Sequence, residues 1–321
     1  MLKISVVVRA FNEERFIAKL LAGIRQQQGV QTEVILVDSG STDATVSIAH
    51  GFGSRIIHIP PEEFTFGRAL NIGLNQASHE IVVLASAHVY PIYRDWLGKL
   101  TSPLESASTG LTYGRQIGNE ITKYSEKRLF ARWFPEQSDF QQRHPFCNNA
   151  NAAVRRSVWE KYRYNEQLTG LEDLELAKRL QSDGLHVSYV ADAPVVHVHE
   201  ETPSRIYNRY RREAFALSQI MPGERMSLVD LIRLWTGNSL SDLYHATLDR
   251  ELTKNWWEIP MFRAMQFYGA YRGFRQKGEL SKELKQRFYY PAPLARNNAQ
   301  CELAQRLVDY SDETLQKDGP H

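Results

Sequence analysis

Short apolar runs that alternate with helical stretches constrain the fold of this chain more than any other feature of its sequence. The runs are rich in β-branched residues, which suits strands buried on both faces of a sheet. The runs span residues 4–8, 34–37, 55–59 and 81–85, and the helical stretches span residues 13–27 and 66–77. This alternation predicts an α/β fold with a mostly parallel sheet and helices on both faces. Ligands of such sheets bind at the carboxyl ends of the strands, so we expect the chemistry in the loops after Val8, Val37 and Ala85.

The character of the sequence changes near Thr202. Strand patterns stop there, and long helical stretches rich in Arg, Tyr, Phe and Trp follow. We therefore expect two domains, an α/β catalytic domain over residues 1–201 and a helical C-terminal region over residues 202–321.

Composition excludes several classes of protein. The 321 residues carry a formal net charge of only +2, so we expect no nucleic-acid partner. Cys147 and Cys301 are the two cysteines, which excludes a disulfide framework and indicates a cytoplasmic protein. The N-terminus reads as a first buried strand rather than a signal peptide, and we find no stretch long enough to span a bilayer.

The loop after the second run begins with Asp38. A carboxylate there can accept a hydrogen bond from the imide N–H of uracil or thymine. The alternative is a turn residue, because Asp is common before helices, with Thr42 or Asp43 as the N-cap of the next helix.

Several segments together resemble family 2 glycosyltransferases. They are VVVRAFNEE, ILVDSGSTDAT, FGRALNIG, CNNANAAVRRSVW and GLEDLELAKRL, in the order of the family's catalytic domain. The resemblance implies a GT-A fold, an inverting transfer from a nucleotide-sugar donor, and a nucleobase and ribose pocket lined by Arg9, Phe11, Asn12 and Asp38. FTFGRALNIG and LTYGRQ are most similar to bacterial rhamnosyltransferases and related surface-polysaccharide enzymes.

The fourth run lacks the Asp-x-Asp that members of this fold use to hold a divalent cation on the donor diphosphate. Ser86 and His88 stand in its place. His88 could bind Mn²⁺ or another cation with His197 and His199, which share one face of an extended strand. Alternatively no metal is used, and Arg68, Arg115 or arginines after Thr202 neutralise the diphosphate. A third interpretation is that His88 is structural.

An inverting transfer needs a base to take the acceptor proton. Glu172 and Asp173 lie at a predicted helix start, where the helix dipole favours the ionised form. The family resemblance assigns the base to Asp173 and leaves Glu172 to position the acceptor or orient Asp173. We expect the pKa of Asp173 to be low until the acceptor desolvates the site.

Three further segments each have more than one interpretation. The resemblance places Asn149 and Asn151 beside the donor sugar, whereas a turn and a packed strand would also explain them. Arg205, Arg209 and Arg212 share a helical face, which suits either a phosphate clamp or solvent exposure. The aromatic and basic stretch 256–277 suits core packing, a homodimer interface or peripheral contact with an anionic membrane.

We therefore predict an inverting glycosyltransferase that moves a sugar from a nucleotide-sugar donor to a glycan or lipid-linked acceptor in bacterial surface-glycan synthesis. A divalent cation, Mn²⁺ or Mg²⁺, is an optional cofactor. We expect the enzyme in the cytoplasm, in contact with the inner face of the plasma membrane if the acceptor is lipid-linked. The rivals are a nucleotidylyltransferase, whose Gly-rich phosphate loop is missing after the first strand, and a catalytically silent sugar-binding protein, against which the Glu172–Asp173 pair argues.

Overall fold

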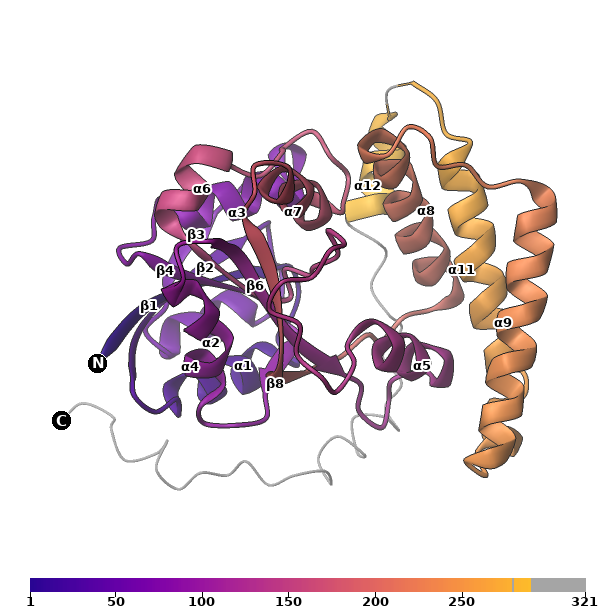
Figure 1. The fold of residues 1–321 in the computed structure, drawn as a ribbon, viewed down its shortest axis with the longest axis horizontal. Helices are drawn as coiled ribbons and strands as arrows, with labels where there is room; N and C mark the ends of the chain where they lie inside the picture. Colours follow the sequence, from indigo (N-terminus) through magenta and orange to yellow (C-terminus); the bar gives the residue numbers. More distant parts are fainter. Residues whose placement is uncertain (279, 290–321) are drawn as a thin grey trace.

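The computed structural model describes residues 1–278 and 280–289. Residue 279 and residues 290–321, which include Cys301 and the end of the predicted second domain, lie outside the described residues. Figure 1 shows an α/β body beside a group of long C-terminal helices.

Eight strands form one mixed sheet in the order β3-β2-β1-β4-β7-β6-β8-β5. The strands are β1 (Leu2–Ala10), β2 (Val30–Asp38), β3 (Arg55–His58), β4 (Ile81–Ser86), β5 (Val89–Pro91), β6 (Thr109–Ile117), β7 (Asn151–Arg155) and β8 (His186–His197). Neighbours among β3, β2, β1 and β4 pair in parallel, as do β6 and β8. β7 is antiparallel to β4 and β6, and β5 is antiparallel to β8. The predicted α/β fold with a mostly parallel sheet is confirmed.

Helices cover both faces of this sheet (Figure 1). In the α/β part they are α1 (Ile17–Arg25), α2 (Thr45–Gly51), α3 (Phe66–Asn75), α4 (Trp96–Thr101), α5 (Tyr124–Trp133), α6 (Arg156–Tyr162) and α7 (Glu172–Ser182), with short 3-10 turns at Pro61–Glu63 and Ser102–Glu105. Along β1, Val7 packs in a core with Leu70 of α3 and Leu176 of α7. Val6 points the opposite way, into a second core with Leu20 of α1. Because neighbouring side chains of β1 point to opposite faces, a run that is apolar throughout can bury both.

The loop after β1 corrects the predicted helix 13–27. α1 begins only at Ile17, because the preceding residues are tied to the loop after β2. The side-chain oxygen of Asn12 accepts the backbone N–H of Thr42 at 2.8 Å, and the backbone N–H of Glu13 donates to Thr45 Oγ1 at 2.7 Å. Asn12 itself has φ 54°, a left-handed conformation that Asn tolerates.

The start of α2 corrects a second prediction. Ala44, and neither Thr42 nor Asp43, is the N-cap of α2. Asp43 still accepts the backbone N–H of Thr45 at 2.9 Å, so it satisfies a helix-start donor from one position further out.

The C-terminal helices are α8 (Pro203–Ile220), α9 (Leu228–Leu248), α10 (Leu252–Asn255), α11 (Glu258–Phe274) and α12 (Lys282–Tyr289). α11 packs against both α8 and α9. Part of the aromatic stretch 256–277 is core, since Phe262 is fully buried, while Trp256 and Trp257 are exposed. The division at residue 202 stays a prediction, although β8 ends at His197 and α8 begins at Pro203. In the part of the chain that the structure describes, no helix has both the length and the apolar character needed to cross a bilayer.

Candidate active site

Glu172 and Asp173 open α7 and are both buried, with exposed fractions of 5% and 9%. Leu171 precedes them with φ 56°, which turns the chain sharply into the helix. Asp173 Oδ2 accepts the backbone N–H of Asn149 at 3.1 Å, and Oδ1 accepts the backbone N–H of Leu174 at 2.8 Å. The carboxylate is therefore fixed by backbone donors from two separate elements.

Burial raises the pKa of Asp173 to about 7, and the neighbouring charge of Glu172 adds to the shift. The hydrogen bonds from Leu174 and Asn149 oppose the shift without cancelling it. The expectation of a low pKa at this helix start is wrong. The protein itself desolvates the group, so no acceptor is needed to raise its pKa.

Glu172 is held by an ion pair. Arg9 Nη1 lies 3.2 Å from Glu172 Oε1, and the Asn149 side-chain amide donates to the same oxygen at 3.4 Å. The Arg9 guanidinium also lies over the Phe66 ring, 5.0 Å from its centroid. In the structure Arg9 therefore serves the acidic pair, and its predicted place in a nucleobase pocket stays a prediction.

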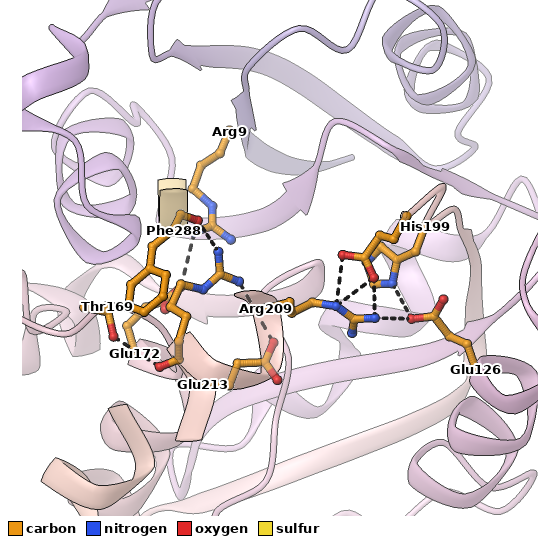
Figure 2. A network of polar contacts seen from close by, with 10 residues as sticks. Arg9, Glu126, Thr169, Glu172, His199, Arg209, Glu213 and Phe288 are labelled. Carbon is orange, nitrogen blue, oxygen red and sulfur yellow. Dashed lines mark hydrogen bonds and ion pairs between the residues drawn. The ribbon is translucent and has the colours of Figure 1, made fainter. Parts of the chain in front are cut away.

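The arginines of α8 do not form one clamp. Arg209 is bound by Glu201 and by Glu126, at 2.6 and 2.7 Å. Arg212 faces the acidic pair instead, 4.6 Å over the same Phe66 ring, and donates to the Phe288 carbonyl of α12 at 3.0 Å. Arg205 lies at the start of α8, where its N–H is capped by Thr202 Oγ1 at 3.3 Å. Figure 2 shows Arg209 beside His199 and Glu126, away from Arg9 and Glu172.

The structure brings His88, His197 and His199 together. The stacked rings of His88 and His197 are 5.0 Å apart, and those of His197 and His199 are 4.1 Å apart. One nitrogen from each imidazole lies within 4.8 Å of the others, close enough to share a cation. His197 ends β8, and His199 follows it in the loop before α8.

Each of these three imidazoles has its Nδ1 engaged by a different side chain. His88 Nδ1 lies 2.7 Å from Glu13, His197 Nδ1 2.6 Å from Gln116, and His199 Nδ1 2.8 Å from Glu126. The Nε2 atom of His197 is buried and has no partner among the described residues. Metal-binding histidines are oriented in this way, with one nitrogen held and the other left for the metal.

The pKa values of His197 and His88 move in opposite directions. Burial lowers the pKa of His197 well below its usual value, and the nearby His199 and His88 add to the effect. That keeps His197 neutral, the form that ligates a metal. Burial also opposes a charge on His88, but Glu13 outweighs it and raises the pKa of His88.

Asp38 occupies the end of β2 and is almost fully buried. Its carboxylate accepts the backbone N–H groups of Gly40 and Ser41 at 3.1 and 3.2 Å and lies 3.2 Å from His58 Nδ1. The alternative interpretation, a turn residue, thus describes what Asp38 does in this structure, and its contact with a nucleobase stays a prediction.

Four further residues were predicted to contact the nucleotide-sugar donor, and the structure places them in different environments. Arg68 is exposed on α3 and pairs with Glu63, and Arg115 pairs with Glu136. Ser86 ends β4 opposite Arg9 of β1. Asn151 is fully buried, and its side chain accepts from Trp96 and donates to the carbonyls of Arg115 and Ala193. Its amide is hydrogen-bonded within the sheet, and its place beside the donor sugar stays a prediction.

Sequence reasoning missed the side chains that hold the site residues in place. They are Glu13, Gln116 and Glu126 behind the histidines, and Tyr164, whose hydroxyl donates to Asn149 Oδ1 at 3.0 Å. Glu13 and Gln116 lie inside the segments VVVRAFNEE and LTYGRQ. These segments carry the family resemblance, and they were the sequence signal that could have identified both residues. Phe11 is half-buried in the loop after β1.

Comparison with known proteins identifies the family. Residues 5–163 match the family model described as glycosyl transferase family 2. The O-antigen chain rhamnosyltransferase WbaN of Salmonella anatum is 24% identical over 293 residues, covering 81% of this chain and 92% of the relative. The O-antigen chain rhamnosyltransferase RfbN of Salmonella typhimurium is 23% identical over 319 residues, covering 88% of this chain and all of the relative.

Solved structures share the fold. The mannosyltransferase PcManGT of Pyrobaculum calidifontis superposes with a TM-score of 0.57 at 18% identity, over 84% of each chain. Residues 1–349 of TarS from S. aureus superpose with a TM-score of 0.51 at 17% identity, over 84% of this chain and 89% of that one. Residues 5–163 are therefore a family 2 glycosyltransferase domain with the GT-A fold, and the chain is a glycosyltransferase that resembles bacterial O-antigen rhamnosyltransferases.

Proposed function

We propose that this enzyme transfers the sugar of a nucleotide-sugar donor with inversion, using Asp173 as the base. The acceptor hydroxyl oxygen attacks the anomeric carbon from the side opposite the nucleoside diphosphate. As the new C–O bond forms and the bond to the diphosphate breaks, the hydroxyl proton passes to the Asp173 carboxylate. Glu172, paired with Arg9, positions Asp173 and the acceptor.

The observation that carries this proposal is the setting of Asp173. A general base works best when its pKa lies near the working pH, because it is then both ionised and able to hold a proton. Burial beside Glu172 raises the pKa of Asp173 to about 7. Backbone donors from Asn149 and Leu174 keep the carboxylate in place for the transfer.

The proposal includes a divalent cation held by His88, His197 and His199. The unpartnered Nε2 of His197 and the engaged Nδ1 atoms fit a ligand set better than they fit a structural cluster. Imidazole favours Mn²⁺, Fe²⁺ or Zn²⁺ over Mg²⁺. When bound, the cation would offset negative charge on the departing diphosphate. The solved structure of PcManGT is a complex with GDP-Man and Mn²⁺, which agrees with this role.

The donor, the acceptor and the cellular location complete the proposal. The two Salmonella relatives are named as O-antigen chain rhamnosyltransferases, which makes rhamnose the first sugar to test. We propose that the nucleotide lies on the loops after β1 and β2, with Asp38 near its base. A glycan or lipid-linked acceptor would be met in the cytoplasm, at the inner face of the plasma membrane.

Asp173→Asn tests the base. We expect turnover to fall about 10²–10⁴-fold, the range for loss of a general base, while nucleotide affinity stays the same. Turnover is measured with nucleotide-sugar donors that carry rhamnose or another sugar linked to UDP, GDP, dTDP or CMP. Nucleotide affinity is measured by calorimetry. Asp192→Asn, at an exposed position of β8, is the control and should keep full turnover. Full turnover by Asp173→Asn would mean that Asp173 is not the base.

His197→Ala tests the cation site. Calorimetry with Mn²⁺ on the wild type should show one site that His197→Ala abolishes. His186→Ala, at the other end of the same strand, should leave the site intact. If the wild type binds no Mn²⁺, Zn²⁺ or Fe²⁺ with or without nucleotide, the metal-independent mechanism holds.

A further inference from the structure

Arg209 and Arg212 are neighbours on α8, yet their guanidinium groups are satisfied very differently. Arg209 donates to the carboxylates of Glu126 and Glu201 at distances between 2.6 and 3.1 Å. Arg212 donates from Nη1 to the Phe288 carbonyl at 3.0 Å, and its buried Nε has no hydrogen-bond partner among the described residues. Carboxylates thus satisfy the structural arginine of this helix, whereas Arg212 has only a neutral acceptor.

The Arg212 side chain is also largely removed from water, since it is 16% exposed. Glu213 Oε1 lies 4.0 Å from Arg212 Nη2, which is too far for a hydrogen bond. Burial lowers the pKa of Arg212, and the charge of Glu213 opposes this shift without cancelling it. A buried charge with so few acceptors is costly, so a ligand that supplies the missing ones would bind well.

Arg212 lies beside the acidic pair. A methyl group built at Gly170 would be 3.5 Å from Arg212 Nε, so this side chain borders the turn that leads into Glu172 and Asp173. Under the function proposed above, Asp173 takes the acceptor proton while the diphosphate leaves on the opposite side. Figure 2 shows His199, part of the candidate cation site for that diphosphate, well apart from Glu172. Arg212 therefore faces the acceptor rather than the donor diphosphate.

The end of α12 occupies the place where an anion would bind Arg212. The Phe288 carbonyl is uncharged, and a hydrogen bond to a neutral acceptor is about half as strong as one to an anion. The Phe288 side chain is buried, and Tyr289 packs edge-on against Phe64 and Phe66, with ring centroids 5.4 and 5.6 Å apart. An anion that bound Arg212 would have to displace this end of α12.

We propose that the acceptor carries a phosphate group near its reacting hydroxyl, and that this phosphate binds Arg212 in place of the Phe288 carbonyl. The inference rests on the proposed function, and it selects a phosphate-bearing acceptor, such as a lipid-linked sugar, over a neutral glycan. A phosphate presents several charged oxygens, which suit the fork of N–H groups on a guanidinium. Binding of the acceptor then moves the end of α12 away from Arg212.

Calorimetric titration of the full chain with inorganic phosphate, without metal, tests this site. We expect Arg212→Gln to weaken phosphate binding at least about tenfold, because a buried charged contact is lost. Arg225→Gln removes an exposed arginine from the loop after α8 and should bind phosphate like the wild type. Circular dichroism confirms that the variants are folded.

Tyr289→Ala should act in the opposite direction. It removes the ring contacts with Phe64 and Phe66, so α12 leaves Arg212 accessible in a larger fraction of the molecules. The apparent affinity for phosphate should rise several-fold in proportion to that fraction. A purely structural role of Arg212 predicts no such gain. The proposal is overturned if Tyr289→Ala binds phosphate no more tightly than the wild type, or if Arg212→Gln binds it equally well.

A second titration identifies the source of the phosphate. A nucleoside diphosphate that binds the enzyme, tested among UDP, GDP and dTDP, should leave the affinity for inorganic phosphate unchanged. If it abolishes phosphate binding, Arg212 belongs to the donor site and the proposal is wrong. Asp173→Asn should still bind phosphate even if turnover points to another base, which separates failure of the phosphate site from failure of the proposed function.

Discussion

Asp173 and Glu126 are both buried carboxylates, yet their pKa values move in opposite directions. Burial and the neighbouring Glu172 raise the pKa of Asp173 to about 7. Burial acts in the same sense on Glu126, but the charges of His199 and Arg209 outweigh it and lower the pKa of Glu126 to about 2. Arg9, whose charge lowers the pKa of Asp173 only in part, forms its ion pair with Glu172.

This difference distinguishes a carboxylate that can react from a structural carboxylate that holds its neighbours in place. Asp173 can take up a proton near neutral pH, whereas Glu126 stays charged and holds His199 and Arg209 in place (Figure 2). Burial alone therefore does not show what a carboxylate does, because the charges around it decide the direction of the shift.

The largest effect is expected for Glu126→Gln. Removing this charge leaves the buried Arg209 with one carboxylate instead of two, and loss of one partner from a buried ionic cluster costs about 3–5 kcal/mol. Because the pKa of Glu126 is lowered from 4.5, its contribution to stability is present above about pH 4.5 and is lost as pH falls toward 2. Urea unfolding near neutral pH measures the change, and the same variant should bind Mn²⁺ more weakly.

Glu136→Gln is the matched control for that measurement. Glu136 pairs with Arg115 but is 84% exposed, so its loss should cost less than about 1 kcal/mol. If both variants lost the same stability, the buried carboxylate of Glu126 would contribute no more to the fold than the exposed ion pair of Glu136.

The pH profile should show the base directly. We expect kcat/KM to rise with pH and level off above a midpoint near 7, where Asp173 loses its proton. Glu172→Gln removes a charge that raises the pKa of Asp173, so the midpoint of the profile should move to lower pH. This shift is expected even if the maximal rate also changes. A profile that is flat between about pH 5 and 9 would mean that Asp173 does not titrate in turnover.

Asp173→Asn should stabilise the folded protein in alkali. The pKa of Asp173 is raised above its usual 3.8, so the group favours folding most below about pH 3.8 and disfavours it once ionised above about 7. A neutral amide avoids that penalty. We expect the melting temperature of the variant to exceed that of the wild type by a few degrees near pH 8 and by much less near pH 5. Thermal unfolding in matched buffers measures both.

The smallest effect is expected for Arg68→Gln. The Arg68 side chain is 40% exposed and paired with Glu63 on the surface of α3. We expect donor KM to change by less than about twofold, since exposed pairs contribute little. A large rise in donor KM would place Arg68 at the donor diphosphate, as the metal-independent alternative predicts.

Much of the fold could be predicted because its determinants are local. The apolar runs identify β1 to β4, since a β-branched run that no charge interrupts can be buried on both faces. β6 and β8 were harder to find, because strands that carry Gly114, Gln116 or Asp192 break that pattern. The start of α1 was misplaced because Asn12 and Glu13 are bonded to a loop that lies 30 residues further along the chain.

The residue types of the candidate site are a property of the sequence alone. Glu172 and Asp173 follow Gly170, and His88 takes the place of an acid after β4, whatever the tertiary structure. Those patterns were enough to predict an acidic pair at a helix start and three histidines that could meet.

Only the tertiary structure decided how these groups behave. The sequence cannot show that Asp173 is desolvated or that Arg9 forms an ion pair with Glu172. Nor can it show that Glu13, Gln116 and Glu126 hold the three histidines. Each of these facts depends on side chains that are distant along the chain and close in space. A pKa or a ligand geometry is set by the few ångströms around a group, and folding alone determines which residues occupy them.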